Sequence, residues 1–162
     1  MRKKISFTLG KQSIRKAIKE LENYKKDIQK KMDILCDRLS ALGATTVSLS
    51  YARVVPFVSD NGGKDYEINV RQEGNHWIIS ANGSDVLFLE YGAGDRYGWG
   101  HPEPNGFGPG TYPGVGHWDD PKGWHTPKGQ KSYGNPPSAG MYFAKKDMRE
   151  QLKKIAEEVF NG

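Results

Sequence analysis

The chain has one cysteine, no long apolar run, and only one proline outside a single segment. Because Cys36 is the only cysteine, an internal disulfide is excluded. No stretch of about 18 apolar residues occurs, so a transmembrane helix is not expected. The N-terminus is basic, as in a signal peptide, but no apolar segment follows it. We therefore expect the protein to stay in the compartment where it is made.

The composition is that of a soluble chain with a modest core. Of the 162 residues, 36% are apolar and 27% are charged, which suits one domain. The net charge of +5 is unevenly distributed: residues 1–42 carry +7, whereas residues 43–162 carry −2. This asymmetry is typical of a solvated, lysine-rich helix face, and it also suits a surface that meets nucleic acid or an acidic partner.

Residues 13–42 predict one long helix, because their apolar positions recur at steps of three and four. These positions are Ile14, Ala17, Ile18, Leu21, Tyr24, Ile28, Met32, Leu35, Leu39 and Leu42. Gly43 predicts the end of the helix, since glycine accepts the left-handed conformation found there. A helix of this size is about 45 Å long and could reach a neighbouring subunit. A coiled coil is less favoured, because the steps do not hold a strict heptad.

Four short segments predict strands, namely residues 45–51, 66–72, 76–81 and 86–91. Residues 73–75, with the sequence Glu-Gly-Asn, predict a tight hairpin turn between the second and third of them. Together the segments predict a small, mostly antiparallel sheet of three to five strands.

Residues 92–140 differ sharply from the rest, since they hold 13 of the 20 glycines and 8 of the 9 prolines. At this density neither a helix nor a regular strand is expected. The segment is also rich in aromatic residues, unlike a flexible linker. We therefore interpret it as a functional loop that becomes ordered against a subunit or partner. The aromatic residues expected to anchor this contact are Tyr97, Trp99, Phe107, Tyr112, Trp118 and Trp124.

A final helix is predicted over residues 139–160, where apolar residues again recur at three and four and Ser138 can cap the first turn. Strands flanked by helices in this order predict an α+β fold, with both helices packed on the small sheet. We expect residues 1–162 to form a single domain.

Candidate catalytic and metal-binding residues do not form a familiar pattern. The histidines His76, His101, His117 and His125 are 25, 16 and 8 residues apart, which does not match a zinc motif. Cys36 lies in the apolar stripe of the first helix, and no Gly-x-Ser-x-Gly motif or phosphate-binding loop is present. The sequence therefore predicts a protein that is not an enzyme and that holds no metal or cofactor.

Two alternatives remain open from the residues alone. A cell-wall hydrolase or another metal-dependent enzyme could use a histidine and aspartate cluster in the loop. Its members would be His101, His117, Asp119, Asp120 and His125. A nucleic-acid-binding accessory protein could instead place the basic first helix against phosphates, without sequence specificity.

A resemblance to a known family rests on residues 88–94, which read FLEYGAG. Phe88, Glu90, Tyr91 and Gly92 resemble the apolar-x-Glu-aromatic-Gly strand end of the head–tail joining proteins (neck or tail-component proteins) of long-tailed bacteriophages. The segment at residues 134–141, which reads GNPPSAGM and is followed by a helix to Val159, is similar to the ending of that family.

This resemblance implies a virion assembly protein with an α+β fold, without catalysis or cofactor. It implies a homo-oligomeric ring between capsid and tail that contacts other neck and tail proteins. Passing DNA would make nonspecific contact, and no membrane partner is implied. The implied location is the virion, and the host cytoplasm during assembly.

Overall fold

The structure is a computed structural model, and it describes most of the chain. The described residues are 5, 10–55, 57–59, 63–94, 96, 100–103, 120–126 and 128–161. Their contacts divide the chain into two compact units, and the division falls inside the two long helices. Unit 1 comprises residues 1–39 and 150–162, and unit 2 comprises residues 40–149. Among the described residues, no helix is both long enough and apolar enough to cross a membrane.

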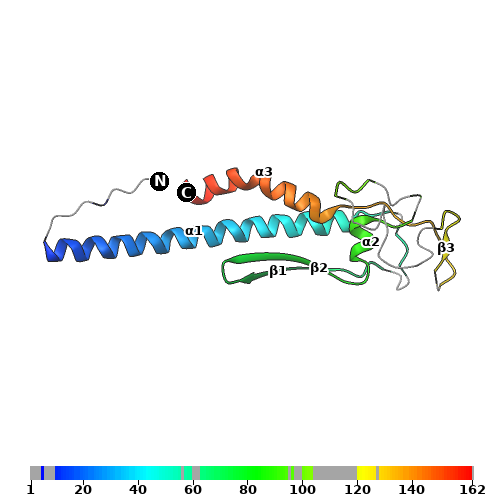
Figure 1. Ribbon diagram of the computed structural model, residues 1–162, viewed down its shortest axis with the longest axis horizontal. Coiled ribbons are helices and arrows are strands. Elements are labelled where there is room, and N and C mark those ends of the chain that lie inside the picture. The colour runs from blue at the N-terminus through cyan, green and yellow to red at the C-terminus, as the bar shows by residue number, and fades with distance from the viewer. Residues whose placement is uncertain are drawn as a thin grey trace. The chain divides into compact units, whose positions relative to one another are not determined.

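The fold is α+β, as the sequence predicts, with a long N-terminal helix, a C-terminal helix and small antiparallel sheets. Helix α1 spans Lys11–Ala52, and helix α3 spans Gly140–Asn161 (Figure 1). The predicted final helix is thus confirmed to within one residue at each end. Helix α1 is ten residues longer at its C-terminal end than the sequence predicts.

Unit 1 consists of the first part of α1 and the last part of α3. Leu35 and Val159 are its large buried apolar residues. Arg38 forms an exposed ion pair with Glu158, at 3.3 Å. The Lys31 ammonium donates to the carbonyl oxygen of Phe160 at 3.4 Å. A cation is favoured at this position, because the last carbonyl groups of a helix lack partners within the helix.

Helix α1 passes straight through Gly43, where the sequence predicts a stop. Gly43 is buried, and a Cβ atom there would lie 2.6 Å from Cδ1 of Ile79 and 2.9 Å from Sδ of Met148. A larger residue at position 43 would have to displace these two atoms, which lie at the ends of flexible side chains, so glycine suits this contact. The glycine therefore permits close packing within unit 2, and the predicted helix end is wrong.

Residues 45–51 belong to α1, so the strand predicted there is wrong. Val47 and Tyr51 are fully buried, and Val54 is buried after them, which is the spacing of one helix face. Leu49 lies on another face of α1 and is 51% exposed. The apolar residues of this short run fit both the period of a strand and the period of a helix. The buried residues are four and three positions apart, which is the helical spacing.

Two strands were predicted correctly and form a hairpin. Strand β1 spans Glu67–Glu73 and strand β2 spans His76–Asn82, and the two are antiparallel with Glu73 opposite His76 (Figure 1). The predicted tight turn is confirmed, and Gly74 adopts the left-handed backbone that such a turn needs, with φ of 58°.

The fourth predicted strand is instead helix α2, which spans Val86–Tyr91. Gly83, with φ of 136°, turns the chain after β2, and the Asp65 backbone lies too close there for any side chain. A short apolar run of six residues does not distinguish a buried helical turn from a buried strand. The sheet accordingly has two strands here, and the prediction of three to five is wrong.

Short strands also occur within residues 92–140, where no regular strand was predicted. Strand β3 spans Trp124–His125 and pairs antiparallel with strand β4, which spans Lys131–Ser132. An isolated antiparallel bridge joins Ala93 to Asn135 and closes the base of the long segment. Strands of two residues tolerate the surrounding glycines and prolines, because they need few ladder hydrogen bonds.

The core of unit 2 lies where α1, α2 and the start of α3 meet. Its buried apolar residues are Val47, Tyr51, Val54, Leu89 and Ala144. Partly buried side chains from the hairpin and its flanks pack against this cluster, among them Tyr66, Ile68 and Ala81. The rings of Tyr51 and Tyr66 meet edge to face, with centroids 5.4 Å apart.

Candidate functional site: a buried carboxylate at the start of the C-terminal helix

The Phe-Leu-Glu-Tyr-Gly motif places a carboxylate inside unit 2. Glu90 lies in the last turn of α2 and is only 6% exposed. A buried carboxylate is costly unless several donors replace its lost water. The donors therefore define what this residue does.

The first two donors are backbone amides of α3. The Met141 amide donates to both oxygens of Glu90, at 3.0 Å to Oε2 and 3.2 Å to Oε1, and the Tyr142 amide donates to Oε1 at 3.4 Å. These amides belong to the first turn of the helix, where N–H groups have no carbonyl partner within the helix. The negative charge also interacts favourably with the positive end of the helix dipole.

The third donor is a side chain of α1. The hydroxyl of Tyr51 donates to Oε2 of Glu90 at 3.0 Å. Burial raises the pKa of Tyr51 far above its usual value, and the charge of Glu90 raises it further. The hydroxyl consequently keeps its proton and stays a donor to the carboxylate.

The fourth donor is His101, whose imidazole is almost completely buried. Its Nε2 lies 3.2 Å from Oε1 of Glu90, and its Nδ1 accepts a hydrogen bond from the Glu103 amide at 3.0 Å. A nitrogen that accepts carries no proton, so the network assigns a neutral ring with the proton on Nε2. The rings of Tyr91 and Tyr142 lie beside it, with centroids 4.6 Å and 6.4 Å away.

The arrangement connects four parts of the chain through one side chain. Each oxygen of Glu90 accepts at least two hydrogen bonds, from α1, from α3 and from the segment at residues 100–103. Since the lone pairs are used, this carboxylate has no open position at which to take a proton from a substrate or to bind a metal. Its chemistry is that of a structural junction and a helix cap.

The glycine of the motif is required by close backbone contact. Gly92 has φ of 81°, and a Cβ atom there would lie 2.8 Å from the Asn135 carbonyl oxygen and 2.8 Å from the Pro137 nitrogen. Asn135 in turn donates from its side-chain amide to the Phe88 carbonyl oxygen at 2.8 Å. The two segments that carry the family resemblance thus lie against each other.

The predicted cap of α3 is only part of the observed one. The Ser138 hydroxyl accepts from the Gly140 amide at 3.3 Å, as expected of a serine next to a helix start. The next two amides are satisfied by Glu90. The backbone amides of Ser138 and Ala139 donate to the Leu89 and Glu90 carbonyl oxygens, which holds the segment in place before the helix begins.

Of the predicted aromatic anchors, the structure describes Trp124, a half-buried residue of β3. The others, Tyr97, Trp99, Phe107, Tyr112 and Trp118, lie outside the described residues. Their contact with a subunit or partner stays a prediction.

The histidine and aspartate cluster is described in part. His101 is buried against Glu90, whereas Asp120 and His125 are exposed, and His117 and Asp119 lie outside the described residues. The Asp120 carboxylate accepts from the Lys122 amide at 2.8 Å, as in a local turn. Across the described part of the chain, no group of three or more potential ligands is placed to hold a metal ion.

Cys36 lies half-buried on α1, within unit 1. Burial raises the pKa of its thiol, and the charge of Asp33 raises it further. A thiol with a raised pKa is a poor nucleophile at neutral pH.

The donors Tyr51, Met141 and Tyr142 were not singled out from the sequence. Two of them act through backbone amides, which carry no residue-specific signal. Comparisons of the chain with protein-family models, with curated proteins and with solved structures find no match.

Proposed function

We propose that this chain is a structural subunit of the head–tail junction of a long-tailed bacteriophage. It acts by assembling into a homo-oligomeric ring and by docking a finished tail to a filled head. Neck and tail proteins are its partners, and no catalysis or cofactor is involved. It assembles in the host cytoplasm and remains in the virion.

The observation that carries this proposal is an apolar stripe left exposed on α1 in unit 1. The stripe consists of Ile14, Ile18, Leu21, Ile28 and Met32, each between 37% and 54% exposed. These residues are separated by steps of three, four and seven residues along the helix, so they share one face. A continuous exposed apolar face usually marks a contact with another protein. An assembly protein needs surfaces of this kind.

The role of Glu90 supports the same proposal. The motif that resembles the phage family contains the one buried acid of α2, and that acid is occupied by backbone and side-chain donors. Its use in holding α1, α2 and α3 together agrees with an architectural protein. A catalytic acid would need an open position beside the carboxylate.

A second function, nonspecific contact with DNA, is favoured by the charge of unit 1. Unit 1 contains 14 Lys/Arg and 8 Asp/Glu, a net charge of +6, whereas unit 2 has a net charge of −1. A basic surface beside passing DNA would give weak binding that falls steeply with salt. This contact is compatible with the ring and does not require a separate activity.

The test is complementation of a phage that lacks this gene, with electron microscopy of the lysate. We expect filled heads and separate, finished tails without the gene, and complete virions when the wild-type gene is supplied. Infectious virions in the absence of the gene would refute the proposal.

Two variants test the apolar stripe in the same assay. The double substitution of Ile18 and Leu21 by Gln should prevent complementation while the protein still folds, because both side chains are exposed. Ile34→Gln is the matched control, since Ile34 is 47% exposed but lies about 160° around the helix from Ile18. An equal loss of complementation with both variants would show that this face of α1 has no special role in assembly.

A further inference from the structure

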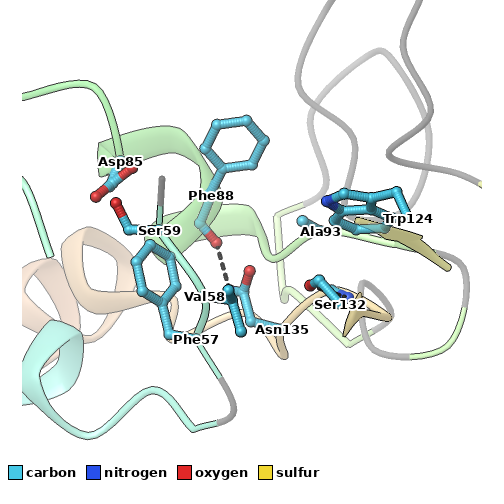
Figure 2. A pocket seen from close by; sticks show the side chains of 10 residues that line it. Phe57, Val58, Ser59, Asp85, Phe88, Ala93, Trp124, Ser132 and Asn135 are labelled. Atoms are coloured by element: carbon cyan, nitrogen blue, oxygen red, sulfur yellow. Dashed lines mark hydrogen bonds between the residues drawn. The ribbon is translucent and has the colours of Figure 1, made fainter. Parts of the chain in front are cut away.

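A small cavity in unit 2 lies apart from the Glu90 junction and is not used by the proposed assembly function. Its volume is about 70 Å³. It is lined by Phe57, Val58, Ser59, Asp85, Phe88, Ala93, Trp124, Ser132, Gly134 and Asn135. Figure 2 shows these side chains arranged around the space, with Asp85 and Ser59 toward one end and Trp124 at the other.

The acid at this cavity is largely buried and makes one hydrogen bond through its carboxylate. Asp85 is 8% exposed, and its Oδ2 accepts from the Asp65 amide at 2.7 Å. Among the described residues, no other donor within hydrogen-bond distance of its carboxylate is found. Glu90, which is buried to a similar degree, has four donors. A nearly buried carboxylate with one hydrogen bond favours a further donor, and a cation most of all.

The other walls suit a positive charge as well. The cavity has three aromatic rings, those of Phe57, Phe88 and Trp124. The face of an aromatic ring attracts a cation, and more strongly where water is excluded. The ring of Phe57 already has the Lys64 ammonium 5.9 Å from its centroid. That ammonium is held elsewhere, because it donates to the carbonyl oxygens of Tyr51 and Ala52 at 2.9 Å and 2.7 Å.

We propose that this cavity binds an ammonium or guanidinium group on a short aliphatic stem. The carboxylate of Asp85 neutralises the charge, and the aromatic rings cover the stem. A bound water needs about 10–15 Å³ of such a volume, so the cavity holds roughly five to seven heavy atoms, which are the charged group and the first carbons of its stem. A Lys or Arg side chain of a second copy and a free alkylamine both present this chemistry.

The experiment is a titration of the folded full-length protein with n-butylammonium chloride, followed by NMR of the tryptophan indole N–H signals. The Trp124 signal is assigned by its loss in Trp124→Phe. We expect a saturable shift of this signal with n-butylammonium and with n-butylguanidinium. The neutral n-butanol should bind at least tenfold more weakly. Equal binding of n-butanol, or no shift of the Trp124 signal at 100 mM cation (a concentration of order 0.1 M reports even very weak binding), would overturn the proposal.

Two acids near the cavity provide a matched pair of variants. Asp85→Asn keeps an acceptor for the Asp65 amide but removes the charge, and we expect at least tenfold weaker binding of n-butylammonium. Asp65→Asn is the control, because Asp65 is exposed and its carboxylate accepts from the Ser84 amide and hydroxyl. Its effect should be less than twofold at moderate salt, and an equal loss in both variants would contradict a role for Asp85.

A further variant keeps the proposal testable if Asp85→Asn does not fold. Phe88→Leu retains the apolar volume and removes one ring, so binding of the cations should fall severalfold while binding of n-butanol stays unchanged. An equal change for both probes would mean that the rings contribute only apolar contact.

Sedimentation velocity distinguishes the two sources of the cation. If a second copy supplies it, Asp85→Asn and added n-butylammonium should both weaken self-association. If n-butylammonium binds and self-association does not change, a free amine is the occupant. This outcome is independent of the ring proposal, because the cavity lies in unit 2 and the apolar stripe lies in unit 1.

Discussion

The substitution Glu90→Gln tests whether the buried carboxylate holds unit 2 together. It conserves shape but replaces one acceptor oxygen by an amide donor and removes the negative charge. The amides of Met141 and Tyr142 and the hydroxyl of Tyr51 would then share a single acceptor. The favourable interaction with the positive end of the α3 dipole would also be lost.

The expected loss is about 3–5 kcal/mol in the free energy of unfolding, as for a buried charged network from which one partner is removed. For a domain of marginal stability this is a large fraction of the total. Urea denaturation followed by circular dichroism measures it, provided the transition is two-state.

Glu103→Gln is the control for the loss of an acid. Glu103 makes an ion pair with Lys145 at 2.6 Å, and its carboxylate is largely exposed. Solvent screens such a pair, so the midpoint of the urea transition should hardly move. A loss of under about 1 kcal/mol for Glu90→Gln would refute the structural role assigned to the carboxylate.

Three further predictions concern single positions in unit 2. Tyr51→Phe removes one charged hydrogen bond and leaves the ring in place, so the free energy of unfolding should fall by about 1.5–3 kcal/mol, measured by urea denaturation; no change would mean that Glu90 finds another donor. Gly92→Ala places a methyl group against the Asn135 carbonyl oxygen at a positive φ, so the free energy of unfolding should fall by about 1–3 kcal/mol, measured by thermal unfolding. An unchanged midpoint would show that the backbone can move aside. The pKa of Asp65 is lowered because its carboxylate accepts hydrogen bonds from the Ser84 amide and hydroxyl. The ionised carboxylate therefore stabilises the fold above the usual aspartate pKa range, and this contribution is lost as pH falls through the lowered pKa. An NMR titration of Asp65 that finds a normal or raised pKa would contradict these hydrogen bonds.

The parts of the fold that were predicted from sequence are those with a long or unambiguous local pattern. The final helix has an apolar stripe over five turns, and the β1–β2 hairpin has alternating apolar residues before a Gly-Asn turn and a short apolar run after it. The first helix was predicted for the same reason as far as Leu42. The basic character of this region and its apolar stripe could also be read directly from the chain, whereas the exposure of the stripe came from the structure.

The errors fall where a short pattern fits two periods. Residues 45–51 and 86–91 are each six or seven residues long, and their apolar residues suit a strand as well as a buried helical turn. Gly43 was interpreted as a stop, because its usual role at a helix end is conformational. Its role here is to let Ile79 and Met148 approach the helix, and the sequence contains no sign of that contact.

The sequence by itself determined the α+β class, the hairpin and the two long helices, because their periodicity is local and extends over many residues. Glu90 and Gly92 were singled out through the resemblance to the phage family. Only the tertiary structure decided what they do. Three of the four donors to Glu90 come from residues 39 positions before it and 51 and 52 positions after it, and two of these are backbone amides that any residue could supply. Such partners are set by how the helices meet, which no local pattern of side chains records.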